Sequence, residues 1–345
     1  MDDIIRVCTY HRRDFDLAVT RLNPRVHDAV QDSLARPFNR PAVKTLGRMQ
    51  VLPLEIVFEI LLCLDLRSLF VFREVNLRAR QVASAVPGYQ PLITHALQAI
   101  CVILRTKIAA WYTLKDVFNV LCTRDCPQCD AFGGFVFLPL LERCCLRCLT
   151  SSPRFRVLPA AEIKKLLGIS QAHLRQSVPL LHTIPGIYSM DESSRKRRMY
   201  IVAVKQVFTA YTFPRTSASV AATAPASRAH AILRYMAGTT LPYVNIESGE
   251  IQRGLCCSGC QILIEGGTTP NPTEDLARRD RVYSKTGFLD HFPRCPEAQK
   301  LWKRSKEGKV AVKLPMSIIR GGYFSERDVI MSYSKRKYSD LQAVN

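Results

Sequence analysis

The chain has 345 residues and carries 49 Lys and Arg against 29 Asp and Glu, a formal net charge of +20. With 47% hydrophobic residues it has enough apolar side chains for packed cores, which excludes wholesale disorder. Glu55, Glu59 and Gln98 interrupt its longest apolar stretches, so no segment offers the roughly 20 uninterrupted apolar residues of a membrane span. The length corresponds to about two or three domains.

The start of the chain and its cysteines indicate a reducing compartment. Residues 1–6 contain no basic stretch followed by an apolar core, so no secretory signal is evident. We therefore expect the cytoplasm or the nucleus, where the thirteen cysteines stay reduced unless they hold metal.

The basic excess lies mainly in residues 191–345, which hold 25 Lys and Arg against 14 Asp and Glu. It gathers in three runs, residues 195–198, 300–313 and 335–337. Such runs serve either as solvated faces and tails or as binding sites for polyanions, so charge alone does not decide between them.

A helical module is predicted for residues 46–95, after an N-terminal extension of residues 1–45. Pro53 fits the first turn of a helix, because the N–H that it lacks would have no partner there. Asp65 and Asn76 are expected to cap a second and a third helix by accepting bonds from free backbone N–H groups. Three short helices cannot bury all their apolar side chains alone, so some face the rest of the chain or a partner.

Residues 52–80 of this module resemble the F-box, the family whose members dock on the Skp adaptor of cullin–RING ubiquitin ligases. The segment begins Leu-Pro-x-Glu-Ile, has the family's leucine spacing and ends Val-Asn-x-x-Ala-Arg. Periodicity alone fits an ordinary helical hairpin equally well. The resemblance implies an adaptor-facing set of Leu52, Pro53, Ile56, Ile60, Leu61, Leu64 and Leu69.

Two C-x-x-C pairs, Cys126 with Cys129 and Cys145 with Cys148, are typical of a zinc site. Each pair presents two sulfurs from a tight turn, and two pairs complete a tetrahedron around one ion. A closed set of four protein ligands predicts a structural site, and the absence of a βαβ pattern argues against a redox C-x-x-C. Cys122 and Cys144 remain alternative ligands. The Phe-Gly-Gly-Phe sequence at 132–135 predicts a glycine turn that leads into a strand.

A second zinc site is predicted from Cys257, Cys260, His291 and Cys295. The thirty-residue gap between its halves exceeds the usual finger spacing, so unpaired core Cys and His residues are the alternative. His291 and Cys295 share one helical face if their segment is helical, although Pro293 limits any helix there. Cys256 is an alternative to Cys257.

The whole arrangement also resembles a group of fungal F-box proteins, in which an F-box precedes a four-cysteine cluster with a Phe-Gly-Gly-Phe core. A Val-Leu-Pro…Lys-Lys-x-x-Gly-x-Ser segment (157–170) and the Gly-Leu-Cys-Cys-Ser-Gly-Cys segment (254–260) extend the match to about residue 302. The resemblance implies a role in a ubiquitin ligase but does not identify the target protein.

The predicted fold is mainly α with small zinc-ribbon β elements. The expected domains are the F-box (46–95), a helical region with the four-cysteine cluster (96–211), a linker or long loop (212–227) and a zinc-containing region with a basic tail (228–345). No catalytic constellation is present, so we expect a non-catalytic substrate receptor that binds the Skp adaptor and an unidentified protein target. The alternative is a zinc-ribbon protein that binds nucleic acid, although aromatic residues are not interleaved with the basic runs.

Overall fold

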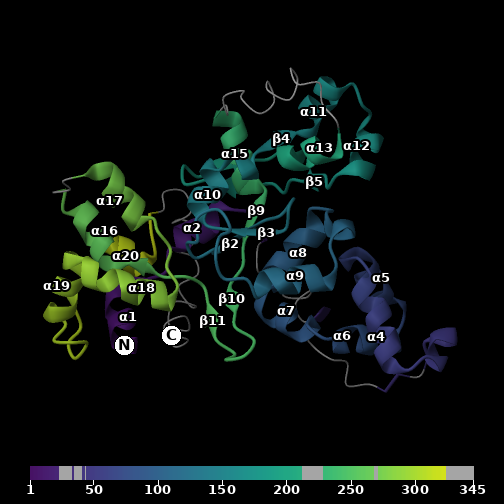
Figure 1. Ribbon diagram of the computed structural model, residues 1–345, viewed down its shortest axis with the longest axis horizontal. Helices are drawn as coiled ribbons and strands as arrows, with labels where there is room; N and C mark the ends of the chain where they lie inside the picture. The colour runs from purple at the N-terminus through teal and green to yellow at the C-terminus, as the bar shows by residue number, and fades with distance from the viewer. Residues whose placement is uncertain (23–32, 35–40, 43, 212–227, 268–270, 324–345) are drawn as a thin grey trace. The chain divides into compact units, whose positions relative to one another are not determined.

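The computed structural model describes residues 1–22, 33–34, 41–42, 44–211, 228–267 and 271–323 (Figure 1). Within these residues the protein is mainly helical with small antiparallel sheets, which confirms the predicted fold class at that level. The predicted linker at 212–227 and the basic run at 335–337 lie outside the described residues. No helix in the described part of the chain has both the length and the apolar composition that spanning a bilayer demands.

Two compact units make up the chain, and they do not follow the predicted domain boundaries. Of the described residues, unit 1 joins 1–18, 187–195, 255–267 and 271–323, whereas unit 2 joins 19–22, 33–34, 41–42, 44–186, 196–211 and 228–254. The difference arises because strands pair between distant segments, which the local sequence pattern does not reveal.

Unit 1 brings the N-terminal segment together with the C-terminal Cys/His region (Figure 1). Strand β1 (Thr9–Tyr10) pairs antiparallel with β12 (Cys256–Cys257), and the Cys8 thiol donates to the Ala298 carbonyl at 3.4 Å. The first eighteen residues are therefore part of a core and not an appended extension. The other elements of unit 1 are α1 (Asp2–Cys8), α2 (Arg13–Ala18), β7 (Ser193–Arg195), α16 (Ser258–Glu265), α17 (Pro272–Arg279), α18 (Lys285–His291), η4 (Phe292–Arg294), α19 (Pro296–Arg304) and α20 (Met316–Arg320).

The helical module of unit 2 folds as its sequence predicts. The Asp65 side chain accepts from the Ser68 N–H at 2.9 Å, and the Asn76 side chain accepts from the Ala79 N–H at 2.8 Å. The second and third helices therefore begin where these caps were expected. The elements of the module are η1 (Gly47–Val51), α4 (Leu54–Cys63), α5 (Leu66–Val75), α6 (Leu77–Ala85) and α7 (Tyr89–His95). It is followed by α8 (Leu97–Arg105), η2 (Ala109–Trp111) and α9 (Leu114–Leu121).

The first cysteine cluster sits beside a three-stranded sheet with strand order β3-β2-β9. The glycine turn leads into β2 (Phe135–Phe137) as predicted, and β2 pairs with β3 (Glu142–Cys144) on one side. On its other side β2 pairs with β9 (Gly238–Thr240), which joins residues 228–254 to the four-cysteine region. The surrounding elements are α10 (Leu146–Ser151), η3 (Pro153–Phe155), α15 (Arg228–Met236), β10 (Tyr243–Val244) and β11 (Ile251–Gln252).

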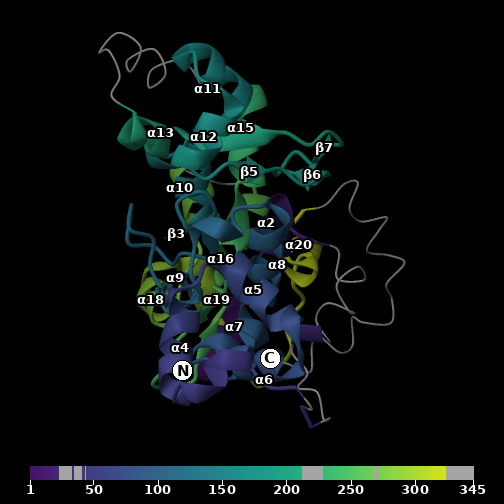
Figure 2. The ribbon, with the colours of Figure 1, turned by 90° about the vertical axis from the view of Figure 1, so that its right-hand side faces the viewer.

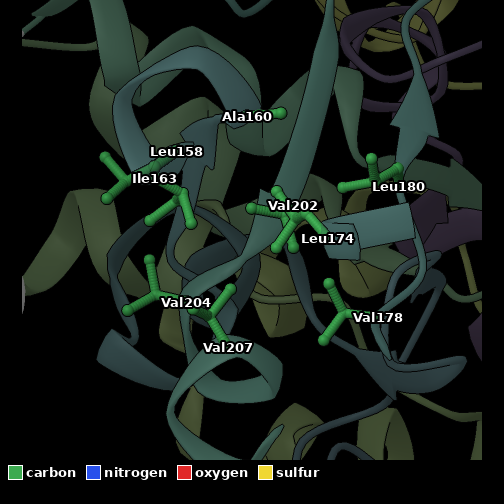
Figure 3. Close-up of a cluster of buried hydrophobic side chains, with 9 residues drawn as sticks. All are labelled: Leu158, Ala160, Ile163, Leu174, Val178, Leu180, Val202, Val204 and Val207. Atoms are coloured by element: carbon green, nitrogen blue, oxygen red, sulfur yellow. The ribbon is translucent and has the colours of Figure 1, made fainter. Parts of the chain in front are cut away.

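A third part of unit 2 is built on a sheet with strand order β4-β8-β5. Figure 2 shows α11, α12 and α13 gathered near β5, and Figure 3 shows the apolar side chains between them, among them Leu158, Ile163, Leu174 and Val202. Burial of these side chains holds the helices on the sheet. The elements are β4 (Val157–Pro159), α11 (Ala160–Leu167), α12 (Gln171–Ser177), β5 (Leu181–His182), β8 (Tyr200–Ala203) and α13 (Val204–Ala210); the short β6 (Gly186–Tyr188) follows β5.

Candidate metal centres

The first centre brings Cys126, Cys129, Cys145 and Cys148 together, with all four sulfurs within 4.8 Å of one another. Cys126 and Cys129 lie in the tight turn before β2, in which the Asp130 N–H donates to the Cys126 carbonyl at 2.9 Å. Cys145 caps α10, and its sulfur accepts from the Cys148 N–H at 3.4 Å. Two local turns therefore present two sulfurs each, as the C-x-x-C spacing predicts.

The spacing of these sulfurs fits a tetrahedral ion. With Zn–S bonds of about 2.3 Å, neighbouring sulfurs of a tetrahedral site lie about 3.8 Å apart. The Sγ atoms of Cys129 and Cys145, which come from different turns, are 3.6 Å apart. The arrangement is compatible with a four-thiolate zinc site without any movement of the backbone.

The two alternative ligands of the first centre lie outside this group. Cys144 is the last residue of β3, where it pairs with Phe135, and burial raises the pKa of its thiol well above the usual value. Cys122 follows α9, and burial likewise raises the pKa of its thiol. The sulfur of Cys145, and not that of Cys144, lies in the group of four sulfurs within 4.8 Å of one another, so the geometry selects Cys145 over Cys144.

Within the first centre the thiols differ in acidity. The pKa of Cys126 falls to about 5, chiefly because the Cys145 thiol donates a hydrogen bond to its sulfur. Burial raises the pKa of Cys148 to about 12. A divalent cation bound by the four sulfurs would displace the thiol protons.

Arg143 is a buried arginine beside this centre that links several backbone segments. Its side chain is buried, and burial lowers the pKa of its guanidinium to about 10. A Cβ on Gly133 would lie 2.5 Å from the Arg143 Cγ, so this turn requires glycine. The guanidinium donates to five backbone carbonyls, those of Val120, Leu121, Gly133, Leu241 and Pro242.

The second centre brings Cys257, Cys260, His291 and Cys295 together, again with all ligand atoms within 4.8 Å. The Sγ atom of Cys295 lies 3.7 Å from that of Cys257 and 3.8 Å from that of Cys260. The His291 Nε2 atom is 3.4 Å from the Cys260 Sγ atom. These separations match the edges of a tetrahedron with about 2.3 Å to sulfur and about 2.0 Å to nitrogen.

Helix ends position the ligands of the second centre. Cys257 caps α16 and its sulfur accepts from the Cys260 N–H, while His291 ends α18 and Cys295 precedes α19. Pro293 lies in η4 between the last two ligands, so the break in the helix falls where the sequence indicated. Cys256 is buried and pairs with Tyr10 in β1, outside the group, and burial raises its pKa to about 12.

Two further residues, Tyr283 and Gly259, support the second centre. The Tyr283 ring stacks on the His291 ring at 4.8 Å between centroids, and its hydroxyl lies 3.4 Å from the His291 Nδ1 atom. This contact orients the imidazole so that its other nitrogen faces the sulfurs. A Cβ on Gly259 would lie 2.3 Å from the Ala298 nitrogen, so glycine permits the close approach of α16 and α19.

The predicted adaptor-facing residues divide into exposed and buried sets. Leu52, Ile56 and Ile60 are 40%, 48% and 40% exposed, Pro53 is also exposed, and Leu64 is half-buried. Leu61 and Leu69 are buried in the module's own core, which removes them from a docking surface. The helical period explains the difference, because Leu61 shares the inward face of α4 with Val57.

These features were compared with known families, curated proteins and solved structures. No family model, no curated protein and no solved structure matches the chain.

Proposed function

We propose that this chain is an F-box-type substrate-receptor subunit of a cullin–RING ubiquitin ligase. Docking on the Skp adaptor would occur through the helical module at 46–95, and the metal-supported remainder would hold a protein target. The chain itself would perform no reaction. Its effect would be proximity, because it raises the concentration of the target's lysines near the ligase's charged thioester.

The outward face of α4 is the observation that carries this proposal. Ile56 and Ile60 lie one helical turn apart and are exposed, while Val57 and Leu61 on the opposite face are about 1% exposed. Leu52 and Pro53 continue the exposed side into the first turn. A helix that buries one apolar face and leaves another uncovered is suited to docking on an apolar partner surface.

We further propose that each candidate centre holds one Zn²⁺ in a structural role. The donor sets, four thiolates in one centre and three thiolates with an imidazole in the other, are those that zinc prefers. All four positions are protein side chains in both centres, which leaves no open position for substrate.

Copurification with the Skp adaptor tests the proposal. Truncating an apolar side chain in such an interface costs about 1 kcal/mol, so Ile56→Ala with Ile60→Ala should weaken adaptor binding about thirtyfold. The affinity is measured by calorimetric titration of the zinc-loaded protein with the adaptor.

Ile246→Ala is the matched control, because Ile246 is an exposed isoleucine (61%) outside the module. It should bind the adaptor like the wild type. Folded wild-type protein that does not bind the adaptor would contradict the proposal. Equal losses of adaptor affinity in the double variant and in Ile246→Ala would show that the contact does not lie on α4.

A further inference from the structure

A cluster of cations surrounds His182 at the open edge of the β4-β8-β5 sheet in unit 2. Burial lowers the pKa of His182, and the positive charges of Lys107, Arg198 and Arg175 lower it further. All three cations are exposed, and they come from three separate segments of the chain. Residues far apart in sequence thus place positive charge around one imidazole.

The backbone holds two of these cations in place. The His182 N–H donates to the Thr106 carbonyl at 2.9 Å, which fixes the residue next to Lys107, and Lys107 itself has a left-handed φ of 65°. The Thr183 N–H donates to the Met199 carbonyl at 2.9 Å, and the Met199 N–H donates to the Thr183 hydroxyl at 2.9 Å. Arg198 is therefore held beside the strand that carries His182.

Aromatic stacking holds the third cation. His182 and Tyr200 are partners in the register of β5 and β8, and their rings stack with centroids 4.7 Å apart. The Arg175 guanidinium carbon lies 5.1 Å from the Tyr200 ring centroid. Cation–π attraction thus orients the guanidinium of α12 over Tyr200.

The lack of acidic partners for these cations indicates an anionic ligand. Lys107, Arg175 and Arg198 form no ion pair with an acidic side chain in the described part of the chain. Exposed cations without carboxylate partners are satisfied by a bound oxyanion, which accepts charge-assisted hydrogen bonds from them.

We infer that this cluster binds the phosphodiester backbone of a nucleic acid strand. Lys196 and Arg197 are exposed and continue the positive surface from Arg198, so the charge extends further than a single phosphate requires. A strand with repeated phosphates neutralises several of these cations at once and releases its own counterions. Tyr200 is already stacked by His182 and Arg175, so the contact is to the backbone and not to the bases.

This inference is independent of adaptor docking, which concerns α4. The test uses the full zinc-loaded chain and a fluorescent single-stranded oligonucleotide longer than the roughly 4–16 nucleotides that such a site spans. Binding is followed by fluorescence anisotropy over a range of salt concentrations. Each phosphate contact contributes about 0.7 to the magnitude of the slope of log K against log salt concentration. The double variant Arg175→Gln with Arg198→Gln removes two such contacts, so the magnitude of its slope should be smaller by about 1.4.

Lys115→Gln is the control for loss of a surface charge, because Lys115 is an exposed cation on α9 outside the cluster. It should leave the slope unchanged. No binding at low salt, or an equal flattening in the control, would overturn the inference. A phosphoserine peptide that binds wild type but not the double variant, while the oligonucleotide does not bind, would reassign the cluster to a phosphoprotein.

Discussion

Adjacent cysteines with different environments define the candidate centres at the scale of single residues. Cys144 ends β3 and is buried as a neutral thiol, whereas Cys145 caps α10 and faces the other three ligands. Cys256 and Cys257 differ in the same way. Successive side chains of a strand point to opposite faces. Of two adjacent cysteines at such a position, one therefore faces the other ligands and its neighbour packs in the core.

The cysteine pair gives a direct test of the first centre. Cys145→Ala should lower the zinc content from two ions per chain to one, because three thiolates no longer close the tetrahedron. Cys144→Ala should keep both ions and lose only packing. Metal analysis of the two purified variants measures this, and a loss of zinc in Cys144→Ala alone would show that the ligand is misassigned.

At the scale of elements, Arg143 connects pieces of structure that would otherwise be held only by short strands. Its guanidinium joins the end of α9, the glycine turn before β2 and the segment between β9 and β10 through their carbonyls. Five donors in a planar fork can reach carbonyls on several sides, which the three donors of a lysine cannot.

Replacement of Arg143 should therefore destabilise unit 2. Arg143→Lys should lower the free energy of unfolding by about 2–4 kcal/mol, because buried carbonyls lose their partners and a buried charge loses its hydrogen bonds. Arg147→Lys, at an exposed position on α10, should change it by less than about 0.5 kcal/mol. Denaturant unfolding of the zinc-loaded proteins measures both, and similar values would contradict the role of Arg143.

At the scale of the whole molecule, each compact unit contains one candidate centre. The first centre belongs to unit 2, and the second belongs to unit 1 together with residues 1–18. The binding free energy of a structural metal is largely folding free energy, so each ion should support its own unit.

Loss of one ion should therefore unfold one unit only. Cys295→Ala should increase amide hydrogen exchange in residues 255–304 and also in residues 1–18, while residues 126–148 stay protected. Cys126→Ala should produce the reverse pattern. Hydrogen exchange followed by mass spectrometry distinguishes the two, and unchanged protection of residues 1–18 in Cys295→Ala would contradict their place in unit 1.

Local patterns predicted the features that depend on near neighbours in sequence. The caps at Asp65 and Asn76, the strand after the glycine turn and the two cysteine turns were predicted because each involves residues a few positions apart. The C-x-x-C spacing likewise predicts the ligands of the first centre and the pair Cys257 and Cys260 of the second, with neighbouring cysteines as alternatives.

Only the tertiary structure decided what depends on distant segments. The pairing of β1 with β12 and of β9 with β2 sets the two units, and the inward face of α4 separates Leu61 from Ile60. The sequence by itself determined the helices, the turns and the ligand pairs, because these form through local hydrogen bonds and covalent spacing. Strand pairing requires segments far apart in the chain to meet, and no periodic pattern shows which strand pairs with which. The helical period places Leu61 and Val57 on one face of α4, but only the tertiary structure shows that this face is the covered one.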